Sequence, residues 1–315
     1  MKHITLSLLF MVAGFIHLKA NKEHHSFLRS IQDTAAEKSS YDYRVQVNGQ
    51  EKFVYRARVS AMPVDVSQAL NRPLEQTEIA AFCYFEVDHE KTITVKSAAD
   101  IKTVVIRPLS MHIKPVIRGN EISFKLYKPC QIVVEVNGWH KALHLFANPS
   151  EKKPFSKTGK NDLYFGPGVH YPGVIFAKSN QTIYIASGAV VHGAISGKNI
   201  SNLNVRGEGI LDGSLFRRNI DTMTNILVFV NCRNVSVSGI ILRDPPAWTF
   251  MTFECMDVTI DNIKLIGMWR YNSDGIDLLN SSNVEIKNSF VRAFDDCITI
   301  KGGDVFRNAP ENSLW

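Results

Sequence analysis

The chain has 315 residues, of which 45% are hydrophobic and 21% charged, and these proportions are typical of a globular protein large enough for two hydrophobic cores. The formal net charge of +6 is mild and no dense run of Lys or Arg occurs, which argues against nucleic-acid binding. The five cysteines are too few and too scattered for a disulfide scaffold, and none has zinc-type spacing with histidine. We therefore expect no metal site and no cofactor.

Residues 1–20 have the pattern of an export signal. Lys2 is followed by an apolar run over residues 4–16 and then by the small residue Ala20. This run is too short to span a membrane as a helix, so a cleaved secretory signal is the favoured interpretation and an uncleaved membrane anchor the alternative. We expect a secreted or periplasmic protein with no membrane contact after removal of the signal. The polar residues 21–40 are predicted to form a linker.

Between residues 41 and 150 the predicted elements are short strands separated by turns. The dipeptides Asn48-Gly49 and Asn137-Gly138 are strong hairpin signals, and the runs around them alternate apolar and polar residues. Several such strands predict an antiparallel β-sandwich domain over residues 41–150. The expected strands span residues 43–47, 53–55, 81–87, 92–96, 103–106, 122–126, 132–136 and 143–146.

A charged stretch that contains Pro and Gly, residues 148–160, leads into a repetitive region. In that region an apolar-polar-apolar unit recurs, with starts 32, 23 and 26 residues apart. One strand in each such period indicates a solenoid, and the lack of fixed Leu positions and of 3.6-residue periodicity argues against leucine-rich and helical repeats. We predict a right-handed parallel β-helix over residues 160–315, so the whole fold is all-β. The units are Leu203-Asn204-Val205, Val235-Ser236-Val237, Val258-Thr259-Ile260 and Val284-Glu285-Ile286.

Four residues of the repeats have a predicted structural role. Cys232 and Cys255 lie 23 residues apart at matching points of two repeats, which favours small packing side chains over metal ligands. Asn262 and Asn288 each lie a few residues past the start of a unit. We expect them to form part of an internal asparagine ladder at a turn.

Three acidic residues precede two short β-type runs near the end of the sequence. Asp274 stands directly before the run at residues 275–278, and Asp295-Asp296 stand before the run at residues 297–300. An offset of 22 residues aligns the apolar positions of the two runs and stacks Asp274 on Asp296. Because side chains alternate along a strand, an offset of 21 would instead place a carboxylate over a core position. The two runs are therefore predicted to be neighbouring strands paired with the 22-residue offset.

This pairing would gather three carboxylates on one outer face. Neighbouring strands lie about 4.8 Å apart, so Asp274 and Asp296 become close neighbours, with Asp295 to one side after a bend in the chain. Ionised carboxylates at such spacing repel one another and raise at least one pKa, which is unfavourable unless the protein uses the cluster. The alternative is that the acids are turn residues in front of solvated strand ends.

The segment Asn272-Ser273-Asp274-Gly275, followed by Asp295-Asp296-Cys297, resembles the motif pair of glycoside hydrolase family 28, the polygalacturonase-like enzymes with a pectin-lyase-type β-helix. Ser273 replaces the family's threonine and keeps its hydroxyl. The segment at residues 166–170 resembles the first coil of these proteins and is similar also to dextranases of family 49, which join a sandwich to a β-helix. The resemblance covers about residues 162–301.

The resemblance implies hydrolysis of glycosidic bonds in a polysaccharide, with a pectic polysaccharide as the first choice, by an inverting mechanism. It assigns Asp295 as the general acid, and Asp274 and Asp296 as the pair that holds and deprotonates the attacking water. Asp212, in a segment that resembles another coil of the family, is interpreted as a structural turn residue. The candidate substrate-binding residues are Asn272, Asp277 and Lys301.

Two further segments of the family do not occur in the sequence. A histidine within Gly-His-Gly, and then an Arg-x-Lys segment that grips a sugar carboxylate, would follow about one coil after the acid pair, but the sequence ends at Trp315. On this ground we expect that the chain is truncated at its C-terminus and inactive as it stands.

Three other functions remain open at this stage. The chain could be a dextranase-like hydrolase of a neutral glucan, a non-catalytic carbohydrate-binding β-helix whose acids bind sugar hydroxyls or calcium, or a polysaccharide lyase. A lyase would need an Arg or Lys base beside calcium-binding carboxylates. The expected partner is in every case a polysaccharide and not a nucleic acid, and no feature of the sequence predicts the oligomeric state.

Overall fold

The computed structural model of the protein describes residues 37–62, 73–151, 155–156, 159–218 and 225–302. The predicted export signal and most of the predicted linker lie outside these ranges. Within them, no helix is long and apolar enough to cross a membrane.

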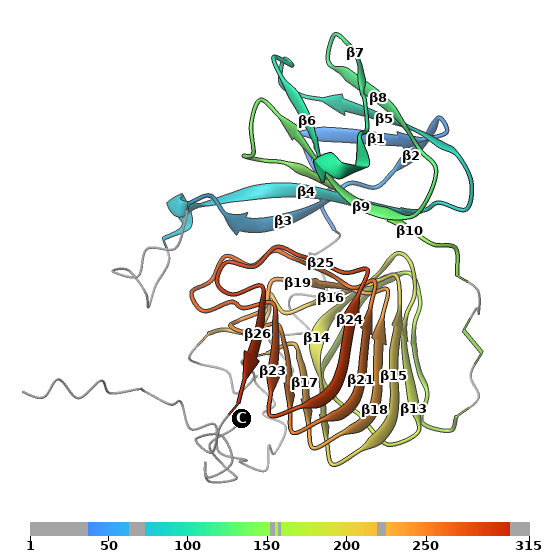
Figure 1. The fold of residues 1–315 in the computed structure, drawn as a ribbon, viewed down its shortest axis with the longest axis vertical. Helices are drawn as coiled ribbons and strands as arrows, with labels where there is room; N and C mark the ends of the chain where they lie inside the picture. The colour runs from blue at the N-terminus through green and yellow to red at the C-terminus, as the bar shows by residue number, and fades with distance from the viewer. Residues whose placement is uncertain (1–36, 63–72, 152–154, 157–158, 219–224, 303–315) are drawn as a thin grey trace, which may run out of the picture.

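The N-terminal part is a sandwich of two five-stranded sheets (Figure 1). Every pairing in the first sheet is antiparallel, and in the second sheet all but one are. In spatial order, the first sheet holds β2 (Gln50–Lys52), β1 (Tyr43–Val47), β5 (Lys91–Ser97), β8 (Glu121–Leu126) and β7 (Val116–Arg118). The second holds β3 (Tyr55–Ser60), β4 (Thr77–Glu86), β10 (Leu143–Asn148), β9 (Cys130–Val136) and β6 (Val104–Arg107).

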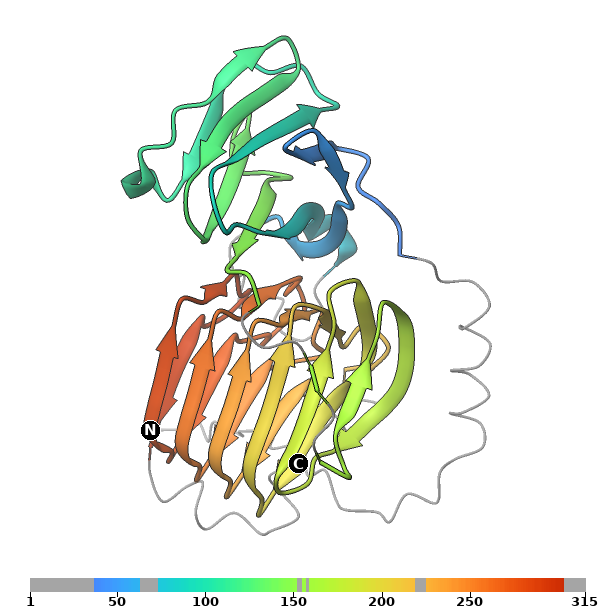
Figure 2. The same ribbon diagram turned by 90° about the vertical axis from the view of Figure 1, so that its right-hand side faces the viewer.

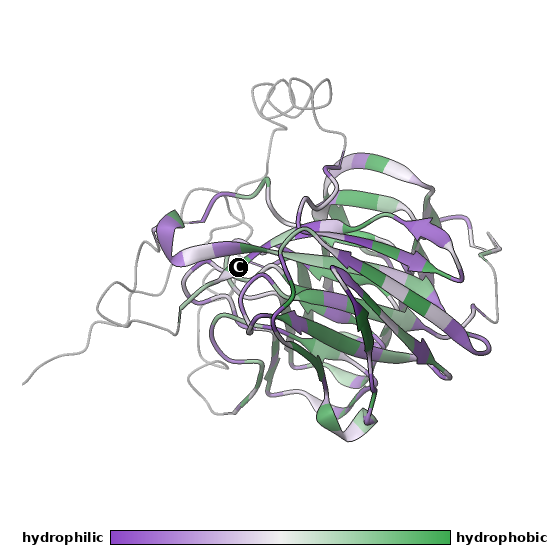
Figure 3. Cartoon of the chain, turned by 90° about the horizontal axis from the view of Figure 1, so that it is seen from above, coloured by the Kyte–Doolittle hydropathy of each residue, from purple (hydrophilic) through white to green (hydrophobic). Residues whose placement is uncertain are grey.

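The strand sequences explain why the two sheets face each other. In β1 the side chains alternate between buried and exposed, and β8 does the same. Figure 3, coloured by hydropathy, shows hydrophobic and hydrophilic residues alternating along the strands. The inward residues form one core, which includes Val45, Ile93 and Ile132.

The exception to the predicted antiparallel order is the pair β4–β10, which is parallel because the long chain between these strands returns in the same direction. The described residues of this part also include the short 3-10 helices η2 (Leu74–Gln76) and η3 (Leu109–Met111).

The C-terminal part is a parallel β-helix (Figures 1 and 2). One sheet has six strands, and a second, ten-stranded sheet bends round a corner at β14 (Ala189–Lys198), whose first residues pair with β16 and whose last residues pair with β17. The six-stranded sheet holds β11 (Leu163–Phe165), β13 (Gln181–Ile185), β15 (Ser201–Gly207), β18 (Arg233–Ser238), β21 (Met256–Asp261) and β24 (Ser282–Lys287). The other strands are β12 (Gly168–Phe176), β16 (Ile210–Asp212), β17 (Leu227–Val230), β19 (Ile241–Arg243), β20 (Phe250–Phe253), β22 (Lys264–Ile266), β23 (Ile276–Leu279), β25 (Phe290–Val291) and β26 (Ile298–Lys301).

The sandwich followed by a parallel β-helix confirms the predicted fold class, and we propose domain boundaries at residues 41–150 and 160–315 from these strand ranges. The interior of the β-helix is filled by the apolar positions of the repeats, such as Val235 and Val237. Cys232 and Cys255 are buried in the same core, as predicted.

Asparagine ladders do run along the coils, although not through the residues predicted. Asn202 donates to Asn180 at 2.8 Å and Asn234 donates to Asn202 at 2.7 Å, and all three have positive φ, which Asn tolerates better than most residues. Asn262 and Asn288 share a turn with positive φ, but the side chain of Asn262 accepts from Gln131 of the sandwich and that of Asn288 donates to Asp261. The prediction for this pair was wrong, because Gln131 of the sandwich is the partner of Asn262 and Asp261 of the β-helix is the partner of Asn288.

The sandwich packs directly on one face of the β-helix. Strand β10 is buried along its whole length, because alternate residues face the sandwich core and the β-helix. The residues facing the β-helix meet the outward residues of its strands, and together they form a separate hydrophobic core. That core contains Tyr55, Ala57, Val59, Ala80, Phe82, Phe146, Val190, Ile210, Ile241 and Ile266, with Phe290 against it.

Some polar residues are buried in this interface as well. Lys264 is fully buried on β22, and its ammonium donates to the side-chain oxygen of Asn148 at 2.5 Å and to the Gly239 carbonyl at 3.0 Å. Burial lowers the pKa of Lys264 to about 7. A buried lysine is tolerated only with such partners, so these bonds fix how the two domains sit together.

Replacing Phe146 by Ala should destabilise the protein by about 3–5 kcal/mol, the usual loss for a buried Phe, because its ring fills the interface core. Denaturant unfolding followed by far-ultraviolet dichroism measures this loss. The matched control is Tyr127→Ala, since Tyr127 is an exposed aromatic residue of the same sandwich and should change stability by no more than about 0.5 kcal/mol. Equal losses for the two variants would contradict the interface core.

Candidate active site

Strands β23 and β26 are paired with the predicted offset of 22 residues. Ile276 pairs with Ile298 and Leu278 with Ile300, and the backbone bond from Gly275 N to the Asp296 carbonyl, 2.8 Å, continues the ladder to the acids. A Cβ on Gly275 would lie 2.3 Å from the Cys297 carbonyl oxygen, so only glycine fits between the two strands here. The register that stacks Asp274 on Asp296 is confirmed.

The acid pair lies on a bend, as expected for adjacent residues that share one face. The loop that leads into β26 is tied to the first motif because the backbone N–H groups of Phe294 and Asp295 both point at the Ser273 carbonyl, at 3.3 and 3.4 Å. Phe294 is buried in the β-helix core, Asp295 is half-buried and Asp296 is exposed. The three carboxylates therefore meet where β23 and β26 begin, and their burial decreases from Asp274 through Asp295 to Asp296.

Burial and mutual repulsion shift the titration of two of these acids. Asp274 is 3% exposed, and burial followed by the charge of Asp277 raises its pKa to about 7. Burial and the neighbouring charge of Asp296 also raise the pKa of Asp295. Oδ1 of Asp274 is buried without a hydrogen-bond partner among the described residues. Such an arrangement favours a group that exchanges protons over one that only holds the fold.

A lysine at the end of β26 partly neutralises the cluster. The Lys301 ammonium lies 2.9 Å from Oδ1 of Asp277 and 3.5 Å from Oδ2 of Asp274, and 3.9 Å from the centre of the Trp248 ring. Asp277 is fully buried and also accepts a 2.6 Å hydrogen bond from the Thr299 hydroxyl. Lys301 therefore connects Asp277 of β23, and Asp274 just before that strand, with the ring of Trp248.

The three candidate substrate-binding residues have different surroundings. Lys301 is half-buried within the acid cluster, whereas Asp277 lies beneath it with no exposed surface. Asn272 is half-buried in the turn before Asp274, with a φ of 58°. Contact of any of them with substrate stays a prediction. Within the described ranges, no group of three or more His, Cys, Asp or Glu side chains is placed to hold a metal ion.

Trp248 and Arg218 are site residues that the sequence reasoning missed. Trp248 precedes Thr249, whose backbone N–H and hydroxyl both bond to the Asp274 carbonyl, at 2.9 and 2.7 Å. Arg218 donates to the Tyr271 carbonyl, and its guanidinium lies 5.2 Å from the centre of the Tyr271 ring. In the sequence, the signal that could have identified Trp248 is that an aromatic residue follows two prolines about one coil before Asp274.

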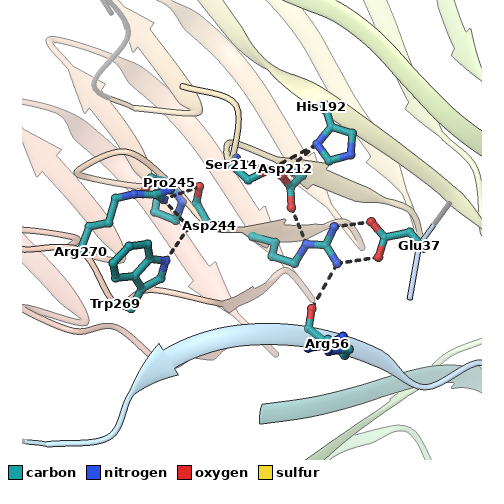
Figure 4. A network of polar contacts seen from close by, with 10 residues as sticks. Glu37, Arg56, His192, Asp212, Ser214, Asp244, Pro245, Trp269 and Arg270 are labelled. Carbon is teal, nitrogen blue, oxygen red and sulfur yellow. Dashed lines mark hydrogen bonds and ion pairs between the residues drawn. The ribbon is translucent and has the colours of Figure 1, made fainter. Parts of the chain in front are cut away.

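A second charged network surrounds Asp212 (Figure 4). Asp212 is buried and forms an ion pair with Arg243. Its carboxylate accepts a hydrogen bond from the Ser214 N–H at 2.9 Å, and its Oδ1 lies 3.0 Å from Nδ1 of His192. Arg243 also pairs with Glu37 at 2.6 Å and thereby fastens the start of the described chain to β19. These contacts agree with the structural role predicted for Asp212.

Comparisons with known proteins place these features among the glycosidases. Residues 166–309 match the model of the glycosyl hydrolases family 28. A polygalacturonase of Persea americana is 27% identical over 161 residues, which are 47% of this chain and 34% of its own. A dextranase of Arthrobacter sp. (strain CB-8) is 24% identical over 188 residues, 51% of this chain and 29% of its own. The chain thus spans about a third of the length of these curated relatives.

Among solved structures, Dex49A from Penicillium minioluteum is similar with a TM-score of 0.58 and 20% identity. The similarity covers 78% of this chain and 61% of that one, which is more of this chain than the family model matches. At this identity the likeness shows a shared fold. The match to the model of the glycosyl hydrolases family 28 lies over the β-helix and includes both acidic motifs.

Proposed function

We propose that the whole protein hydrolyses glycosidic bonds in a polysaccharide by an inverting mechanism, with Asp295, Asp274 and Asp296 as its catalytic residues. The observation that carries this proposal is the 22-residue pairing of β23 and β26, which gathers three carboxylates and leaves two of them with raised pKa values. Glycoside hydrolysis needs one protonated carboxyl group and one carboxylate on opposite sides of the bond. The match of residues 166–309 to the model of the glycosyl hydrolases family 28 supports the same chemistry.

The surroundings of each acid suggest its part in the reaction. Asp295 would protonate the departing glycosidic oxygen, since burial and Asp296 favour its neutral form. Asp274 and Asp296 would hold a water molecule and take its proton as the water oxygen attacks the anomeric carbon. The glycosidic bond breaks to the side of Asp295, and the configuration at the anomeric carbon inverts because attack comes from the opposite face.

We propose a pectic polysaccharide as the substrate, which the similarity to a plant polygalacturonase supports. Lys301 and Arg218 supply positive charge near the acids for a sugar carboxylate. A neutral glucan is the second candidate, because the dextranase similarity extends over half of the chain and the Lys301 ammonium is already paired with Asp277 and Asp274.

Export to the cell exterior or periplasm stays a prediction, since residues 1–20 lie outside the described residues.

Incubation of the full gene product with polygalacturonate and, separately, with dextran tests the function. We expect release of reducing ends from polygalacturonate, and proton NMR of the first product should show the anomeric configuration opposite to that of the bond cleaved. Release from dextran alone would select the second candidate. Binding without hydrolysis of either polymer would instead favour the non-catalytic β-helix, and products with ultraviolet absorbance would indicate a lyase.

Asp274→Asn, Asp295→Asn and Asp296→Asn should each lower kcat by about 10²–10⁴-fold, the usual contribution of a general acid or base. Folding should persist. Because the pKa of Asp274 is raised from 3.8 to about 7 in the folded state, this carboxyl costs stability progressively as the pH rises between these two values. The loss is complete at pH 8, where Asp274→Asn should keep or raise Tm. Turnover by Asp295→Asn within a few-fold of the wild type would refute the acid assignment.

Lys301→Met should move the acidic limb of the kcat/KM profile to higher pH. The Lys301 charge lowers the pKa of Asp274, which must be ionised to accept a proton, so loss of the charge raises that pKa. A nearby opposite charge shifts a pKa by about 1 or more, and the limb should move by about 1 pH unit. Lys287→Met removes a lysine of β24 paired with Glu285 and is the matched control. An unmoved limb in Lys301→Met would exclude Asp274 as the base.

A further inference from the structure

The loop that carries Asp295 begins at the edge of the sandwich. Strand β25 pairs with β22 at the end of the ten-stranded sheet that packs on the sandwich, and Asp295 follows four residues after it. The Phe290 ring of β25 lies 5.3 Å from Phe146 and 5.6 Å from His144, between ring centres. Both partners come from β10, so the entry to the acid loop is packed against the sandwich.

Arg292, the first residue of this loop, is held by sandwich side chains. Its Nη1 lies 3.2 Å from Nε2 of His144, and its Nη2 lies 3.7 Å from Oε1 of Glu78. The Arg292 side chain is 23% exposed and that of Glu78 is 9% exposed. A guanidinium stays charged in proteins, so at this interface it needs an acceptor and a counter-charge, and the sandwich supplies one of each.

The contacts of His144 determine which of its ring nitrogens accepts the hydrogen bond from Arg292. Nδ1 of His144 lies 3.1 Å from the Ala81 carbonyl and must donate to it, which leaves Nε2 as the acceptor for the Arg292 N–H. Burial, and then the charge of Arg292, lowers the pKa of His144 to about 3, so the ring is neutral at neutral pH. Glu78 is fixed as well, by the Lys141 N–H at 3.1 Å and by His140 at 2.9 Å.

On its other side the loop has weaker support. The Arg292 N–H donates to the Leu265 carbonyl at 3.0 Å, but the N–H groups of Phe294 and Asp295 share the Ser273 carbonyl at 3.3 and 3.4 Å. Both of these distances exceed the usual 2.9–3.0 Å for such a bond. The Phe294 side chain anchors the loop to the β-helix core, and Arg292 anchors it to the sandwich.

We propose that the sandwich holds the acid loop in place through Arg292, and that Arg292 is a positioning residue for Asp295. The inference rests on the proposed role of Asp295 as the general acid. Arg292 acts through geometry, since burial and Asp296 are the main influences on the Asp295 carboxyl. The sandwich is then a part of the catalytic apparatus and not a separate binding module.

Hydrogen–deuterium exchange tests the bracing without any need for activity. In Arg292→Met, the backbone amides of residues 293–297 should exchange at least several-fold faster than in the wild type. Glu78→Gln, a milder change made in the sandwich alone, should give a smaller acceleration in the same peptide and keeps the test valid if Arg292→Met folds poorly. Glu90→Gln removes an exposed sandwich pair with Lys125 and should leave this peptide unchanged. Unaltered exchange in Glu78→Gln and Arg292→Met overturns the proposal.

Kinetics then test the positioning of the acid. Misplacement of a catalytic group by about 1 Å can reduce a rate about 10²-fold, so Arg292→Met should lower kcat on polygalacturonate by about 10–10² with little change in KM. A 4-nitrophenyl galacturonide needs little protonation of its leaving group, and its hydrolysis should fall much less. Equal losses on both substrates, or no loss, overturn the positioning role. Faster exchange in a protein with no glycosidase activity supports the brace and refutes the proposed function.

Discussion

The pairing of each coil with the next is the constraint on which the whole β-helix depends. In a parallel ladder the register between neighbouring coils decides which side chains enter the interior and which face outward. Ile276 and Leu278 point inward only because β23 pairs with β20 and β26 in register. The same register places Asp274 beside Asp296, so the stability of the core and the assembly of the acid cluster have one cause. A slip of one residue would destroy both.

A second constraint comes from strands that are buried on both faces. Where the sandwich covers the β-helix, outward positions that would otherwise meet water face a second domain. Apolar residues such as Ile241 and Ile266 suit that position directly. The charged residues Lys264 and Arg292 are accepted there because Asn148 and His144 offer hydrogen-bond acceptors at matching points of β10. The apolar contacts of the interface stabilise the association of the two domains, and the polar contacts fix their relative position. Together they hold the acid loop in place.

The strands and the register could be predicted from the sequence because they depend on local patterns. Alternation identifies β1 and β8, and the aligned apolar runs identify the pairing of β23 with β26. The parallel pair β4–β10 joins segments far apart in the chain, with no turn signal between them, and could not be predicted this way. His144 looks like an ordinary strand residue in the sequence, since its burial results from the contact between domains. Trp248 was missed for a similar reason, because only the stacking of coils brings it to Lys301.

Lys301 acts unequally on the two acids proposed as the base and the general acid. Burial raises the pKa values of Asp274 and Asp295 together, and the charge of Lys301 lowers both. Lys301 lies 3.5 Å from Asp274, whereas the main influences on Asp295 are burial and the charge of Asp296. The ladder places Lys301 beside β23 because it pairs with Leu279, so its charge reaches the first acid more directly than the second. The coil register thereby decides both that the acids meet and that the Lys301 charge acts more strongly on Asp274 than on Asp295.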